Sequence, residues 1–108
     1  MERDENLDLL NYINEKLKSD HGGLIKKVIL FGSRVKGDAR PYSDYDVLLI
    51  LSQDVDWQQK DKIINSIADI NLEKDILIDV HMISVSELMT IKGKQPYIQN
   101  ALHTGVAL

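Results

Sequence analysis

The sequence predicts an α/β (α+β) domain in which helices cover one face of a mixed β-sheet of about four strands. Short apolar runs such as Val28–Phe31 and Val47–Leu51 indicate buried strands. Longer segments between them repeat apolar residues every three or four positions, as amphipathic helices do. The length of 108 residues suits one hydrophobic core, so a single domain over residues 1–108 is expected.

The composition excludes several classes of protein. A formal net charge of −4 argues against general nucleic-acid binding, which depends on many Lys and Arg contacts to phosphate. The absence of cysteine leaves only oxygen and histidine ligands for any metal. The longest apolar run, Val47–Leu51, is far shorter than the roughly 20 residues of a membrane-spanning helix. Since the acidic N-terminus does not resemble a secretory signal, no membrane association and a cytoplasmic location are expected.

The first half of the chain predicts a helix, a strand and a loop. The buried stripe of the helix is formed by Leu7, Leu10, Ile13 and Leu17. Gly22-Gly23 ends that helix, and the strand Val28–Phe31 then stops at the turn Gly32-Ser33. A one-turn helix over Arg34–Gly37 and a loop over Gly37–Ser43 lead to the next strand.

A strand over Asp44–Leu51 and a long helix follow. Asp56 and Gln59 have the spacing of a capping box, and the helix is expected to end near Lys74. Its buried stripe is formed by Ile63, Ile67 and Ile70. Trp57, at the start of this helix, is expected to anchor it by packing.

The last third predicts a strand, two short helices and an edge strand. The strand covers Asp75–Ile83, and a capping box of Ser84 and Glu87 begins a short helix that ends by Gly93. Pro96 and Gly105 bracket the final helix, because proline suits a first helical position and glycine a helix end. Val106–Leu108 can add an edge strand.

Three aspartates on the predicted strands could carry chemistry. Asp44 and Asp46 are two residues apart, so both carboxylates point to one face. Asp79 lies inside an apolar strand, where a lone buried carboxylate costs several kcal/mol unless it is paired or bound to metal. Together they could hold two divalent ions and accept the proton of an attacking hydroxyl. Alternatively, Asp44 and Asp46 are only turn and strand-start residues, and Asp79 faces water at a sheet edge or pairs with a lysine.

The segment after the first strand could bind phosphate. Gly32 lets the backbone approach a phosphate, and Ser33 can donate its hydroxyl. The basic residues nearby are Arg34, Lys36 and Arg40. No Gly-Lys-Ser/Thr follows, so the segment is not a P-loop. The alternatives are a plain turn and a solvated basic face. His81 shares the predicted face of Asp79, and we interpret it as a structural residue.

The pattern Gly32-Ser33, Gly37 and then Ser43-Asp44-Tyr45-Asp46 before an apolar strand resembles the minimal nucleotidyltransferases of the DNA-polymerase-β-like superfamily. The resemblance covers about residues 28–51 and the strand of Asp79. It implies a nucleotidyltransferase fold and an enzyme that uses ATP and two Mg²⁺ ions. The residues that it implies for catalysis and metal binding are Asp44, Asp46 and Asp79. Those assigned to nucleotide binding are Gly32, Ser33, Arg34, Lys36 and Ser43.

Short domains of this superfamily often act beside a helical HEPN-type toxin as MNT-type antitoxins. The resemblance therefore implies transfer of AMP to a hydroxyl of a protein partner. An open site in a domain of this size favours completion by a second chain, either that partner or another copy in a homo-oligomer. Two alternatives stay open: a non-catalytic module that caps a toxin, and an enzyme that modifies a small molecule such as an aminoglycoside.

Overall fold

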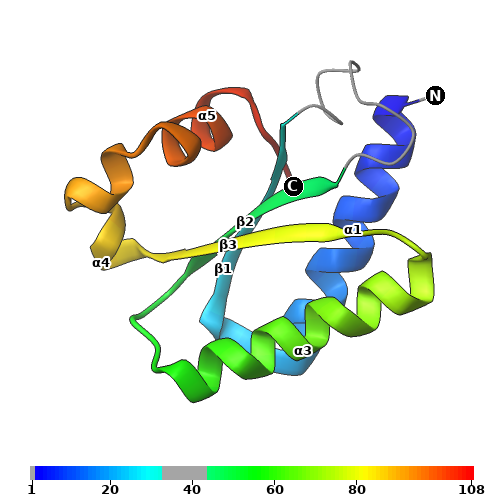
Figure 1. The fold of residues 1–108 in the computed structure, drawn as a ribbon, viewed down its shortest axis with the longest axis horizontal. Coiled ribbons are helices and arrows are strands. Elements are labelled where there is room, and N and C mark those ends of the chain that lie inside the picture. The colour runs from blue at the N-terminus through cyan, green and yellow to red at the C-terminus, as the bar shows by residue number, and fades with distance from the viewer. Residues whose placement is uncertain (1, 33–43) are drawn as a thin grey trace.

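The computed structural model describes residues 2–32 and 44–108 (Figure 1). The predicted one-turn helix Arg34–Gly37 and loop Gly37–Ser43 lie outside these residues. The elements are α1 (Glu2–His21), η1 (Gly22–Leu24), β1 (Ile25–Phe31), β2 (Tyr45–Leu51), α3 (Trp57–Lys74), β3 (Ile78–Ser84), α4 (Val85–Leu88), η2 (Ile91–Lys94), α5 (Pro96–Thr104) and β4 (Val106–Ala107). Among the helices described, none is long and apolar enough to cross a membrane.

The strands form one mixed sheet in the order β3-β2-β1-β4. β1 pairs antiparallel with both β2 and β4, whereas β2 and β3 run parallel and are joined through α3. The mixed four-strand sheet and the edge strand near the C-terminus are as predicted. The register places Asp46 opposite Phe31 on one side and opposite Asp79 on the other.

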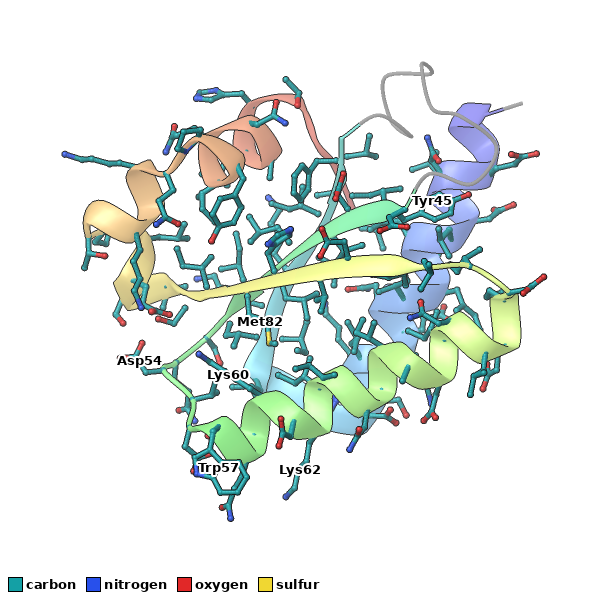
Figure 2. The ribbon with its side chains drawn as sticks, in the orientation of Figure 1. Tyr45, Asp54, Trp57, Lys60, Lys62 and Met82 are labelled. Carbon is teal, nitrogen blue, oxygen red and sulfur yellow. The ribbon has the colours of Figure 1, made fainter. Side chains whose placement is uncertain are left out.

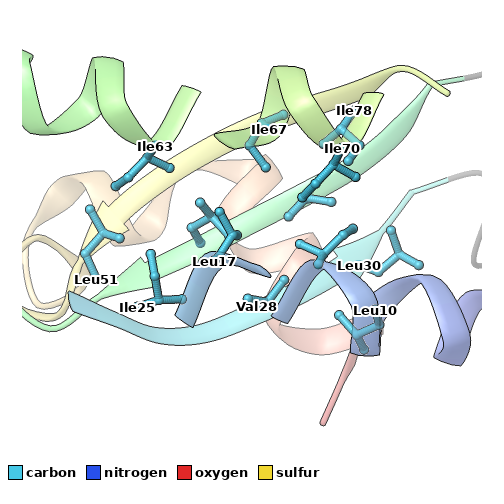
Figure 3. Close-up of a cluster of buried hydrophobic side chains, with 13 residues drawn as sticks. Leu10, Leu17, Ile25, Val28, Leu30, Leu51, Ile63, Ile67, Ile70 and Ile78 are labelled. Atoms are coloured by element: carbon cyan, nitrogen blue, oxygen red, sulfur yellow. The ribbon is translucent and has the colours of Figure 1, made fainter. Parts of the chain in front are cut away.

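Helices cover both faces of the sheet, so the expectation of a single covered face was wrong. On one face, α1 and α3 bury a large apolar cluster that includes Leu10, Leu17 and Ile67 (Figure 3). On the other face, Ile98 and Ala101 of α5 pack on strand residues such as Leu48. The five consecutive buried residues Val47–Leu51 explain this coverage, because a strand that is apolar on both sides needs cover on both.

The helix caps form where the sequence predicted them, and the cap that ends α3 explains why β3 begins later than predicted. Both capping boxes, Asp56 with Gln59 and Ser84 with Glu87, are formed in both directions. α3 ends at Lys74 as expected, and Asp75 closes it in the left-handed conformation with φ 53°. A residue in that conformation cannot continue into a strand, so β3 begins at Ile78 and not at Asp75.

Two further positions differ from their predicted roles. Gly105 ends α5, but with φ −75° it is not a left-handed cap. A side chain there would collide with Ile29 and with the carbonyl of Ala101, so its small size is what the fold needs. Trp57 is 69% exposed and points away from the body of the protein (Figure 2), so it does not anchor α3 in the core.

Candidate active site

Two aspartates meet where β2 and β3 begin. The register pairs Asp46 directly with Asp79, and neighbouring strands lie about 4.8 Å apart. Asp46 shares a strand face with Leu48, two residues later, and that is the face on which α5 packs. The parallel pairing of two strands separated by α3 thus brings together carboxylates that are 33 positions apart (79 − 46) in the sequence.

A histidine joins the two carboxylates. Asp46, Asp79 and His81 each offer one ligand atom, and these atoms all lie within 4.8 Å of one another. The Nε2 atom of His81 is 3.5 Å from Oδ2 of Asp79. Two carboxylates and an imidazole are donor types that bind divalent cations, so this cluster fits a metal ion.

The electrostatics of the cluster also favour a cation. Partial burial raises the pKa of Asp46, and the neighbouring charges of Asp79 and, more weakly, Asp44 raise it further, while His81 opposes them. A raised carboxyl pKa means that the ionised form is disfavoured by its surroundings. A bound cation would remove that penalty, because it pairs with the same negative charges.

Gly32 gives Asp46 the space that its carboxylate occupies. Gly32 adopts φ +87°, a conformation that residues with side chains rarely take. A Cβ atom at this position would collide with Oδ2 of Asp46. The absence of a side chain at Gly32 is therefore needed for the observed position of Asp46. The expected approach of its backbone to a phosphate stays a prediction.

The setting of Asp79 differs from the one predicted. Its side chain is 54% exposed, so Asp79 is not the buried lone carboxylate that the apolar strand predicted. β3 is one of the two edge strands of the sheet, and Asp79 lies near its beginning, where water reaches the side chain. The alternative of an aspartate exposed at a sheet edge describes the observed position.

The other predicted site residues are only partly placed. Asp44 is exposed and lies one residue before β2, close enough for its charge to act on Asp46. Four predicted nucleotide-binding residues lie outside the described residues: Ser33, Arg34, Lys36 and Ser43.

The aromatic group around His81 was not predicted from the sequence. The imidazole centroid lies 4.8 Å from that of Tyr97 on α5 and 6.0 Å from that of Phe31 on β1. These rings come from three elements whose pairing no local pattern revealed. The spacing of Asp79 and His81 was the one available signal, because residues two apart on a strand share a face.

Comparison with known proteins identifies the family. The nucleotidyltransferase domain family matches residues 10–103, and the chain belongs to this family. The protein is accordingly a nucleotidyltransferase, with the mixed α/β fold described above.

Two relatives come from Methanocaldococcus jannaschii. One, named "Putative protein adenylyltransferase MJ0604", is 33% identical over 92 residues, which cover 85% of this chain and 86% of that protein. The other, named "Putative protein adenylyltransferase MJ0141", is 36% identical over 76 residues, 67% of this chain and 76% of the relative.

Solved structures share the fold at low sequence identity. A toxin–antitoxin complex with AMP-PNP matches with a TM-score of 0.62 and 18% identity, over 90% of this chain and 69% of that chain. A tri-AMPylated Shewanella oneidensis HEPN toxin in complex with MNT antitoxin matches with a TM-score of 0.57 and 17% identity, over 99% of this chain and 71% of that chain.

Proposed function

We propose that this nucleotidyltransferase transfers AMP from ATP to a hydroxyl of a protein partner, a helical HEPN-type toxin, and so acts as its antitoxin. The observation that carries the proposal is the pairing of Asp46 with Asp79 across β2 and β3. The names of the two archaeal relatives support a protein acceptor. The fold neighbours, a complex with AMP-PNP and an AMPylated HEPN toxin bound to MNT antitoxin, support the nucleotide and the partner.

The donor set fits the divalent ions that such a transfer needs. Asp46 and Asp79 would hold the ions with Asp44, and Mg²⁺ is the ion expected from their oxygen ligands. When bound, two divalent ions would neutralise charge on the triphosphate and on the attacking and leaving oxygens. The raised pKa of Asp46 agrees with this assignment, since it reflects first the partial burial of the carboxylate and then the neighbouring charge of Asp79.

The chain's own groups account for the proton in the proposed reaction. The acceptor hydroxyl oxygen forms a bond to the α-phosphorus, and the bond from that phosphorus to the bridging oxygen of the β-phosphate breaks. Pyrophosphate leaves with the electron pair of the broken bond. A carboxylate oxygen of Asp46 or Asp79 accepts the hydroxyl proton, as a carboxylate positioned beside the acceptor can do in general base catalysis.

The position of the label in ATP distinguishes the proposed transfer of AMP from phosphorylation. The protein is mixed with the HEPN-type protein encoded beside it, if its genome carries one, and with Mg²⁺ and ATP labelled on either the α- or the γ-phosphorus. Label on the partner from α-labelled ATP alone is the expected result. Transfer from γ-labelled ATP would instead indicate phosphorylation and contradict the proposal.

Matched variants tie the activity to the site. Asp46→Asn and Asp79→Asn should lose the transfer, whereas Asp8→Asn, on the exposed side of α1, should keep it. If the wild type transfers no label but binds and inhibits the partner as well as Asp46→Asn does, the chain is a non-catalytic antitoxin. Label appearing only on an added aminoglycoside would instead favour a small-molecule acceptor.

A further inference from the structure

We propose that His81 is a nitrogen ligand of one metal ion, so that this position binds a divalent transition ion such as Mn²⁺ more tightly than Mg²⁺. The inference rests on the proposed function, because it assumes that Asp46 and Asp79 hold the metal. It goes further by adding a donor of another chemical type and by naming the class of ion that this donor selects.

The geometry places the imidazole among the carboxylates. Asp79 and His81 are two residues apart on β3, so their side chains share a face. Two ligand atoms bound at about 2.1 Å to one ion lie about 3–4.2 Å apart. The observed separations of up to 4.8 Å among Asp46, Asp79 and His81 therefore need only small side-chain rotations to close on one ion.

Packing holds the imidazole in this position. Its ring lies between Phe31 of β1 and Tyr97 of α5, at tilted angles of 49° and 40°. Phe31 is buried and comes from a central strand, so it gives the ring a rigid support. With Nε2 directed at Asp79 and the ring held by aromatic contacts, less side-chain freedom is lost when an ion binds.

The donor type then decides which ion is preferred. Mg²⁺ is a hard ion that takes oxygen ligands and gives up its water reluctantly. Imidazole is a softer donor that suits first-row transition ions. Three carboxylates alone suit both Mg²⁺ and Mn²⁺, and the addition of the His81 nitrogen shifts the preference of the ion that it contacts toward the transition ion.

A competing role for His81 predicts different behaviour. The imidazole could instead donate a hydrogen bond to Asp79 and orient that carboxylate from outside the metal shell, a common arrangement around metal ligands. In that case no bond joins nitrogen to the ion, and loss of His81 would weaken all divalent ions alike. The test must therefore detect the nitrogen directly and compare two ions.

The experiment measures ion binding to the purified protein and needs neither partner nor activity. Mn²⁺ and Mg²⁺ affinities are obtained by calorimetric titration, and pulsed electron paramagnetic resonance of bound Mn²⁺ reports coupling to a nitrogen nucleus. The variants are His81→Phe, which keeps an aromatic ring between Phe31 and Tyr97, and Asp46→Asn. His103→Phe, on the exposed end of α5, is the matched control.

We expect tighter binding of Mn²⁺ than of Mg²⁺ by the wild type, with nitrogen coupling. His81→Phe should abolish the coupling and weaken Mn²⁺ by about 10–100-fold, the usual cost of losing a metal-site partner. Its Mg²⁺ affinity should change by less than about threefold, because Mg²⁺ prefers oxygen ligands. His103→Phe should resemble the wild type. If His81→Phe does not fold, as judged by circular dichroism, His81→Leu repeats the test.

Two other results would overturn the inference in distinguishable ways. If Asp46→Asn abolishes ion binding but His81→Phe keeps the coupling and the Mn²⁺ affinity, His81 is not a ligand and the proposed function stands. If Asp46→Asn leaves the binding of both ions unchanged, the carboxylate site itself is wrong, and the proposed function fails with the inference.

Discussion

The carboxyl pKa values of acidic side chains are shifted in opposite directions at the two ends of the strand pair β2 and β3. At the beginning of the strands, burial and the charge of Asp79 raise the pKa of Asp46. At the other end, hydrogen bonds from Ser84 and Ser86 lower the pKa of Asp54, and an interaction with Lys92 lowers that of Glu87. Figure 2 places Tyr45 and Asp54 at these opposite ends. The seven residues of β2, which lie between the two ends, span about 20 Å.

The difference distinguishes acidic groups with a structural role from those of the proposed active site. At the far end, Asp54 accepts bonds from two serine hydroxyls, and Glu87 completes the cap of α4. At the beginning of the strands, the carboxylates of Asp46 and Asp79 lie side by side with His81, and no lysine or arginine of the described residues forms an ion pair with them. Acidic groups that the fold satisfies serve stability, whereas acidic groups that repel one another are prepared for a ligand from outside.

The strongest test of this comparison exchanges one aspartate at each end for asparagine. Asp46→Asn should lower AMP transfer by at least about 100-fold, since disturbing even the outer partners of a metal site costs about 10–100-fold. Asp54→Asn should leave the transfer rate within about twofold, because Asp54 lies at the other end of the strands. Single-turnover transfer with α-labelled ATP measures both.

Thermal unfolding of the same two variants, without metal, should show the reverse order. A raised folded-state pKa means that ionised Asp46 destabilises the fold as pH rises through that pKa, so Asp46→Asn should be more stable than the wild type at pH 7. Asp54→Asn should be less stable, because its pKa is lowered by hydrogen bonds to the ionised form. A loss of stability in both variants would show that the two ends are alike.

Alanine substitutions of two glycines distinguish the effect of backbone strain from that of crowding against Asp46. Gly22 and Gly32 both have positive φ, so alanine at either position should cost about 1–3 kcal/mol in the free energy of unfolding. Only at Gly32 would the new methyl group meet Asp46, whereas Gly22 has open space around it. Urea unfolding and Mn²⁺ titration together measure this. Metal affinity should fall in Gly32→Ala alone, and an equal fall in Gly22→Ala would mean that strain is the cause.

Ser84→Ala tests the hydrogen-bonded end through pH. The loss of the N-cap should cost about 0.5–2 kcal/mol at pH 7. Because the folded-state pKa of Asp54 is lowered, the stability that its bond to Ser84 provides is present above the ordinary pKa and is lost as pH falls through the folded value. The difference between wild type and variant should therefore shrink between pH 7 and about pH 3.

The control for this pH effect is Ser52→Ala. Ser52 donates its hydroxyl to the carbonyl of Gly23 and contacts no carboxylate in the described structure. Its effect on the free energy of unfolding should not vary with pH over the same range. A Ser84→Ala effect that is equally constant would show that the cap alone matters and that Asp54 adds nothing.

The sequence predicted the parts of this fold whose causes are local. The caps at Asp56 and Ser84 depend on residues three positions apart, and the strands on short apolar runs, so both can be recognised without tertiary contacts. Coverage of the second face by α5 was missed because its two buried residues, Ile98 and Ala101, form too short a pattern to indicate a direction of packing.

The site was predictable in its acidic residues but not in its surroundings. Strand alternation predicts that Asp44 and Asp46 share a face, and this stays a prediction because β2 begins one residue after Asp44. The meeting of Asp46 with Asp79 depends instead on the parallel register of β2 and β3. The contact of Gly32 with Asp46 and the packing of His81 against Tyr97 join separate elements. Such contacts follow from the tertiary arrangement and leave no periodic trace in the sequence.

The smallest expected effect concerns an ion pair at the hydrogen-bonded end. Lys92 lies 2.6 Å from Oε2 of Glu87, but its own side chain is 63% exposed. Exposed ion pairs contribute about 0.2–1 kcal/mol and are screened by salt. Lys92→Met should therefore lower the free energy of unfolding only slightly, and the loss should disappear near 1 M salt. Lys94→Met, which removes a nearby lysine with no recorded partner among the described residues, should have no salt-dependent effect. A larger loss that persists in high salt would mean that Lys92 holds Glu87 in the cap, since the other oxygen of that carboxylate accepts the backbone N–H of Ser84.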